Sequence, residues 1–226
     1  MKRLRLVFPA AIAAFLAIAL WGAASASAVT LCKENQKKCP AGMAYAKETV
    51  FVLKAASEVV FNAPKLFTAR CLGSTFESKT KAESGAPLLG TIPTFTLGVG
   101  TPPKCEGCEE IFARALGYNT KFQELTGQWT LTVESGGSGG PGFRLTKCPP
   151  GGKEECVYAS TSYGLNFTGG NPASLAAAKV SLPFFAGSAA ACGTSIEWTA
   201  TYQITEATEP GQKGVANPPV WASEMP

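Results

Sequence analysis

Apolar and polar side chains alternate most clearly in residues 194–205, and this pattern predicts a long β-strand. On one side of the stretch lie Ile196, Trp198, Ala200, Tyr202 and Ile204, with serine, threonine, glutamate and glutamine between them. Because successive side chains of a strand point to opposite faces, we expect one buried face and one solvated face. The two aromatic side chains on the inner face need a facing layer, so we expect them to pack in a core.

Similar runs, alternating or rich in β-branched and aromatic residues, recur between turn residues along the chain. The predicted strands are 49–54, 58–61, two strands within 65–79, 94–99, 128–134, 143–148, 156–160, 165–168 and 175–182. We expect 49–54 and 58–61 to form a hairpin and Trp129 to face inward, whereas 109–116 fits either a helix or a strand. The pattern predicts an all-β fold, an antiparallel β-sandwich or barrel of roughly nine to eleven strands with disulfide-clipped loops.

The two ends of the chain differ from this pattern. Basic residues occupy positions 2, 3 and 5, an apolar run covers 6–21, and small residues fill 23–28. This order predicts a secretory signal peptide cleaved after Ala28, with Ala26 as the second choice. An uncleaved anchor is the alternative, but Pro9 and the run of about 16 residues argue against a spanning helix, which needs about 20. We therefore expect a signal peptide at 1–28, a single β-sandwich-like domain at 29–205 and a loose C-terminal tail at 206–226.

Two residue types are absent, and their absence excludes several kinds of chemistry. The chain has no histidine, and all of its acidic residues are glutamates. Ser-His-Asp and Cys-His catalysis, histidine-bearing zinc sites and Asp-rich calcium loops are therefore excluded. The formal net charge is +4, and three of these charges lie in the predicted signal peptide. We expect no cofactor, no metal, no nucleic-acid partner and no transmembrane segment after signal removal.

Eight cysteines behind a signal peptide predict disulfide bonds and a secreted, extracellular or cell-envelope location. Cys32 and Cys39 enclose a short polar loop, and so do Cys148 and Cys156, so we expect these two local pairs. Each bond should contribute roughly 2–3 kcal/mol by restricting the unfolded chain. The pairing of the other four remains open from the sequence: Cys71, Cys105, Cys108 and Cys192.

Two motifs suggest an enzyme, each beside a structural alternative. Cys105 and Cys108 have the Cys-x-x-Cys spacing of thiol–disulfide exchange, but no βαβ pattern surrounds them, which favours structural cysteines. Adjacent glutamates at 109–110 and 154–155 suggest glycan hydrolysis, but neighbours on a strand face opposite ways. A catalytic carboxylate pair would therefore need glutamates from separate segments. A Ser–Lys arrangement of Ser160, Ser162 and Lys153 has no supporting spacing.

Several short motifs together resemble a family of uncharacterised, exported bacterial β-proteins. The motifs are Leu31-Cys32 with Cys39-Pro40, the run 131–137, the turn 168–173 and the strand segment 198–202. The resemblance covers about residues 31–205 and implies export and β architecture, without an activity, ligand or catalytic residue.

The main functional hypothesis is a non-enzymatic secreted or cell-envelope structural or binding module. Its partner would be a surface component, a glycan or a small apolar ligand, with exposed aromatic residues as a binding platform. The alternative is an exported enzyme, either a thiol–disulfide oxidoreductase using Cys105 and Cys108 or a glutamate-dependent glycan hydrolase. A concave cleft holding two glutamates would favour the hydrolase.

Overall fold

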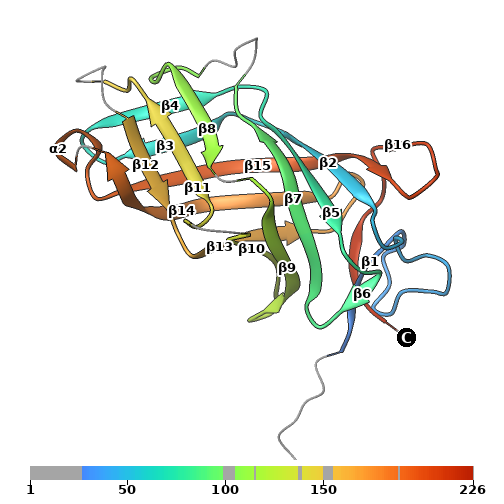
Figure 1. Ribbon diagram of the computed structural model, residues 1–226. Coiled ribbons are helices and arrows are strands. Elements are labelled where there is room, and N and C mark those ends of the chain that lie inside the picture. Colours follow the sequence, from blue (N-terminus) through green and yellow to red (C-terminus); the bar gives the residue numbers. More distant parts are fainter. Residues whose placement is uncertain are drawn as a thin grey trace, which may run out of the picture.

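The computed structural model describes residues 27–98, 105–114, 116–136, 139–149, 155–187 and 189–225 (Figure 1). Within these ranges the fold is all-β, as predicted, and the helical element is a single turn, α2, at Ala189–Cys192. The predicted signal peptide lies outside the described residues, except for Ser27 and Ala28. The strands are β1 (Val29–Cys32), β2 (Val50–Ala55), β3 (Val59–Ala63), β4 (Phe67–Cys71), β5 (Thr75–Thr80), β6 (Ser84–Gly85), β7 (Leu88–Thr96), β8 (Glu110–Arg114), β9 (Tyr118–Leu125), β10 (Gln128–Glu134), β11 (Gly142–Thr146), β12 (Glu155–Ala159), β13 (Ser162–Thr168), β14 (Ser174–Gly187), β15 (Ser195–Thr208), β16 (Val215–Ala216) and β17 (Trp221–Glu224).

Eight strands close into an antiparallel barrel: β2, β5, β7, β9, β10, β13, β14 and β15. Each pairs with the next in this order, and β15 returns to pair with β2. The order follows the chain, so the barrel is an up-and-down meander and the remaining strands are excursions from it. An eight-stranded barrel has an interior just wide enough for side chains or for one small ligand.

The strands β14 and β15 are fourteen residues long and extend beyond the barrel into a second sheet. There β3 and β4 add to β15, while β12, β11 and β8 add to β14 (Figure 1). The barrel and the second sheet therefore share the pair of strands that includes the clearest predicted strand.

The predicted hairpin between 49–54 and 58–61 is wrong. Both segments pair with β15, one after the other, so that Ala55 lies opposite Tyr202 and Val60 opposite Thr199. The bend between them does not reverse the chain, because the Ala56 N–H donates to the Thr201 carbonyl and keeps the backbone beside β15.

Residues 109–116, left open by the sequence, contain the strand β8. Ile111 is buried and Ala113 packs against the core, whereas Phe112 between them is exposed. Pairing with β11 satisfies the backbone of this segment, and this tertiary contact overrides the helix propensity of its alanine and glutamate residues.

The side chain of Trp198 is fully buried in the core, as predicted. Five aromatic rings have centroids 5.0 to 6.5 Å from its ring, those of Phe61, Phe95, Phe143, Tyr163 and Tyr202. These rings come from both the barrel and the second sheet, so Trp198 joins the cores of the two. Its indole N–H has no hydrogen-bond partner among the described residues.

All five tyrosines of the chain have a pKa above the ordinary value of about 10. Burial raises the pKa of Tyr45, Tyr118 and Tyr158 to about 12, and it also raises the pKa of Tyr163 and Tyr202. Because the folded state holds these protons more tightly, the corresponding stability is complete below about pH 10 and is lost as pH rises through about 12.

We therefore expect alkaline titration of the folded protein to show no phenolate absorbance near pH 10 and a rise only towards pH 12. The same chain in denaturant should titrate near pH 10. Near-ultraviolet absorbance and far-ultraviolet circular dichroism, recorded on one sample, check this expectation. Phenolate formation near pH 10 with native circular dichroism would contradict it.

A three-stranded sheet, β17-β1-β6, covers one end of the barrel (Figure 1). The expectation of a loose tail at 206–226 is wrong, because β15 continues to Thr208 and β17 pairs with β1. Val220 is fully buried, and the Tyr45 hydroxyl donates a 2.7 Å hydrogen bond to the Pro219 carbonyl. The apolar residues near the C-terminus thus close the barrel.

Candidate functional site

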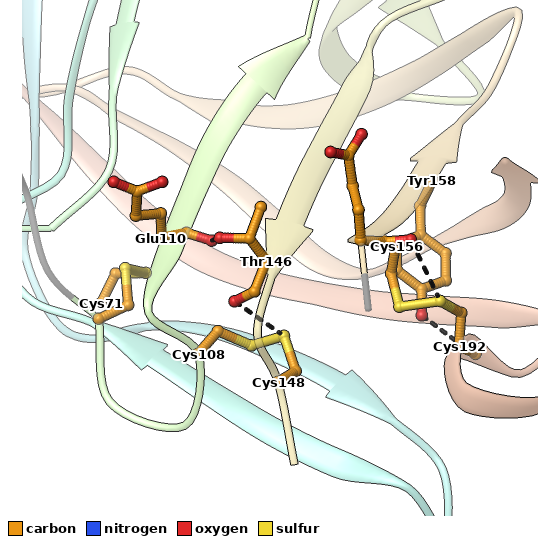
Figure 2. Close-up of a disulfide and its surroundings, with 10 residues drawn as sticks. Cys71, Cys108, Glu110, Thr146, Cys148, Cys156, Tyr158 and Cys192 are labelled. Atoms are coloured by element: carbon orange, nitrogen blue, oxygen red, sulfur yellow. Dashed lines mark hydrogen bonds between the residues drawn. A yellow bond between two sulfur atoms is a disulfide. The ribbon is translucent and has the colours of Figure 1, made fainter. Parts of the chain in front are cut away.

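Disulfide bonds account for all eight cysteines, and three of the four bonds join distant segments. Cys32 and Cys39 are bonded to each other, as expected. The expected bond between Cys148 and Cys156 is wrong: Cys148 is bonded to Cys108, and Cys156 to Cys192 (Figure 2). Cys156 is buried within β12 and is bonded to the last residue of α2. Cys148 follows the end of β11 and is bonded to Cys108, which precedes β8, so the two cysteines link different segments.

The Cys-x-x-Cys motif is split between two cross-links. Cys105 is bonded to Cys71 at the end of β4, and Cys108 is bonded to Cys148 beyond β11. Arg70 and Glu106 also exchange two backbone hydrogen bonds, at 2.9 and 2.7 Å. The motif therefore joins the β4 edge of the second sheet to β11 and has no dithiol, which contradicts the oxidoreductase hypothesis.

The motif residues that the structure describes do not form a catalytic group. Glu109 pairs with Lys147, and Glu155 lies 3.8 Å from Arg144, so these carboxylates do not face each other. The Ser160 hydroxyl donates to the Ser162 carbonyl at 2.7 Å. Lys153 and Glu154 lie outside the described residues. No group of three or more potential metal ligands occurs within the described ranges.

A hollow of about 280 Å³ lies beside the barrel end that β1 covers, and we call it the Trp129 hollow. Three elements build it: the β9–β10 hairpin, the turn between β6 and β7, and the paired strands β1 and β17. Its lining residues are Ser27, Val29, Ala86, Pro87, Gln123, Glu124, Trp129 and Glu224.

Trp129 is half-buried at the rim of the barrel rather than enclosed in the core as expected. Its indole stacks on Phe122 with a centroid distance of 5.6 Å and an interplanar angle of 11°. The stack fixes the orientation of the indole and occupies one of its faces. Trp129 follows the β9–β10 turn closely, and this closeness to a turn is the sequence signal that alternation alone overlooked.

The polar groups of the hollow are held by backbone pairing. Glu124 lies directly opposite Trp129 across the β9–β10 pair. Glu224 is fixed at both backbone groups, because its N–H donates to the Lys37 carbonyl and its carbonyl accepts from the Cys39 N–H, each at 2.9 Å. The Cys32–Cys39 loop therefore positions one wall of the hollow.

This arrangement suits a ligand with an apolar face and several hydroxyl groups. A sugar ring can stack its C–H face on an indole, while carboxylate and amide groups bond to its hydroxyls. The hollow is lined by two glutamates and by no lysine or arginine among the described residues. Its charge therefore favours a neutral ligand over an anionic one.

A second hollow, of about 250 Å³, contains an ion pair between Lys33 and Glu209 at 2.8 Å. Burial alone would raise the pKa of Glu209, but hydrogen bonds from Lys33 and the Ala46 N–H lower it overall. Lys33 also lies 5.2 Å above the Tyr45 ring. The charges of Lys33 and Glu209 are thus paired within the protein, and the pair joins the segment after β1 to the end of β15. Because these polar groups already have partners, we consider the Trp129 hollow the better of these two ligand sites.

No family model, no curated protein and no solved structure matches this chain. The resemblance to exported bacterial β-proteins therefore stays a prediction. Within the described part of the chain, no helix has the length and apolar character needed to cross a membrane.

Proposed function

We propose that the protein is a secreted or cell-envelope binding module that holds neutral glycans in the Trp129 hollow. The observation that carries this proposal is the stacked, half-exposed indole of Trp129 beside Gln123, Glu124 and Glu224. The four disulfide bonds are compatible with an extracellular role.

Replacing Trp129 with alanine should weaken binding to a neutral glycan by about tenfold, because the stacking surface for the sugar is lost. A glycan array identifies the ligand first, and isothermal calorimetry then compares the variants. Phe185→Ala is the matched control, because Phe185 is an exposed aromatic residue on β14 away from the hollow. Equal losses in the two variants, or no neutral glycan bound by the unmodified protein, would refute the proposal.

Glycan hydrolysis is the second candidate, because Glu124 and Glu224 come from separate segments and line the same hollow. Glycosidases use two carboxylates on either side of one glycosidic bond. Release of new reducing ends from the bound glycan, abolished by Glu124→Gln and by Glu224→Gln, would favour the hydrolase. Binding without release of reducing ends favours the binding module.

A further inference from the structure

The start of the described chain forms part of the wall of the Trp129 hollow. Ser27 and Val29 both line it. The same two residues would become the amino terminus at the two predicted cleavage positions, after Ala26 and after Ala28. Whichever of these two peptide bonds is hydrolysed, the new amino terminus belongs to a residue on the wall of this hollow.

Cleavage of the signal peptide changes the charge at this wall. Hydrolysis of a peptide bond adds the oxygen of water to the carbonyl carbon, which becomes a carboxylate on the released segment. Both hydrogens of the water go to the nitrogen, which becomes the α-ammonium group of the mature chain. An amino terminus has an ordinary pKa of about 8, so this group is mostly charged at pH 7. The mature chain therefore carries a positive charge at the hollow that the uncleaved chain lacks.

Hydrogen bonds and burial hold this end of β1 in place. The Ala28 carbonyl accepts from the Met225 N–H at 2.8 Å, and the Thr30 hydroxyl donates to the Glu83 carbonyl at 2.7 Å. The second of these bonds remains after either cut. Thr30 is fully buried and Val29 is 7% exposed, so movement of the strand away from the barrel end would expose apolar surface to water.

Two carboxylates line the hollow around this end of β1. Glu224 lies directly opposite Val29 in the β1–β17 pair, and the Cβ atoms of such neighbours are about 4.5–5.5 Å apart. Glu124 lines the hollow from the β9–β10 hairpin, whereas the turn between β6 and β7 contributes only the uncharged Ala86 and Pro87. Neither glutamate makes an ion pair with another residue in the described ranges. Carboxylates without a partner stabilise the charged form of a neighbouring amino group.

We propose that the mature amino terminus is part of the Trp129 hollow, where its ammonium group pairs with Glu224 and Glu124 and donates a hydrogen bond to the bound glycan. An ammonium group has only donors and an ionised carboxylate only acceptors, whereas a sugar hydroxyl needs both kinds of partner. The ligand in this proposal rests on the proposed glycan binding, and the ammonium group rests on cleavage of the signal peptide.

Export of the full chain by a secreting host, followed by intact-mass spectrometry, identifies the mature amino terminus. The rate of α-amine acylation at pH 7 then tests the ion pair without any ligand, because only the uncharged amine reacts. We expect Glu224→Gln and Glu124→Gln each to raise this rate about threefold. Glu155→Gln is the matched control, because Glu155 is exposed on β12 and does not line the hollow. A terminus other than Ser27 or Val29, or the same rate in all three variants, would overturn the proposal.

Chemical modification of the mature protein tests the contact with the glycan. Acetylation removes the charge of the α-amine, whereas reductive dimethylation keeps the charge and one N–H donor. Both reagents also modify lysines, but no described lysine lines the hollow. We expect acetylation to weaken glycan binding about fivefold and dimethylation to weaken it clearly less.

Two outcomes separate this proposal from the proposed function. Glycan binding that is equally strong before and after acetylation would overturn the role of the ammonium group while leaving the glycan site intact. If the unmodified protein binds no neutral glycan, the proposed function fails, and the acylation rates alone then decide whether the ammonium group pairs with the two glutamates.

Discussion

Replacing Cys108 and Cys148 together with serine is expected to lower the free energy of unfolding by about 4 kcal/mol. The two cysteines are 40 residues apart, so their bond removes a large loop from the unfolded ensemble. Replacing Cys32 and Cys39, which are 7 residues apart, should cost only about 2 kcal/mol. The difference follows from loop length, because a longer closed loop restricts the unfolded chain more.

Urea unfolding of both double variants under non-reducing conditions measures the two losses. The Cys32/Cys39 variant is the control for the general effect of replacing a disulfide. Equal losses in the two variants would show that native contacts, and not loop closure, set the contribution of each bond. Hydrogen exchange should show the larger loss of protection in β8 and β11, which the Cys108–Cys148 bond holds at one end.

Trp198→Ala should lower the free energy of unfolding by about 3–5 kcal/mol, the range for removing a buried aromatic side chain. The side chain is fully buried, and rings from both the barrel and the second sheet surround it. The cavity left behind would lie between the two parts, where neither can collapse into it without disrupting its own strand pairing.

Trp198→Phe should cost clearly less than Trp198→Ala. Phenylalanine fills most of the space, and the indole N–H that it removes has no partner among the described residues. Denaturant titration compares the two variants. A loss below about 1 kcal/mol for Trp198→Ala, typical of a surface position, would contradict the central role of this side chain.

The Trp129 hollow depends on the Cys32–Cys39 loop and on the C-terminal strand β17. The Cys32–Cys39 loop holds the backbone of Glu224, and the C-terminal strand β17 supplies that residue. Removing this disulfide should therefore weaken glycan binding as well as stability. Removing the Cys156–Cys192 bond near α2 should affect stability alone.

Local patterns in the sequence determined the all-β class, the strand over most of 194–205, the burial of Trp198 and Tyr202, and the bond within the Cys32–Cys39 loop. These features depend on residues close together in the chain. Alternation shows which side chains share a face of a strand, and a short loop keeps two cysteines near each other whatever the fold.

Only the tertiary structure decided which strands meet, and through them the three long-range disulfide bonds and the proposed glycan site. Strand pairing sets β2 and β3 end to end along β15, and it brings Glu224 to the hollow that Trp129 and Glu124 line. Apolar and polar residues alternate in the same way in the strands of an open sheet and of a closed barrel. The pattern therefore does not specify which strands pair with each other. The closure of the barrel and the pairing of the C-terminal strand β17 with β1 place Trp129 at a rim, beside Glu224.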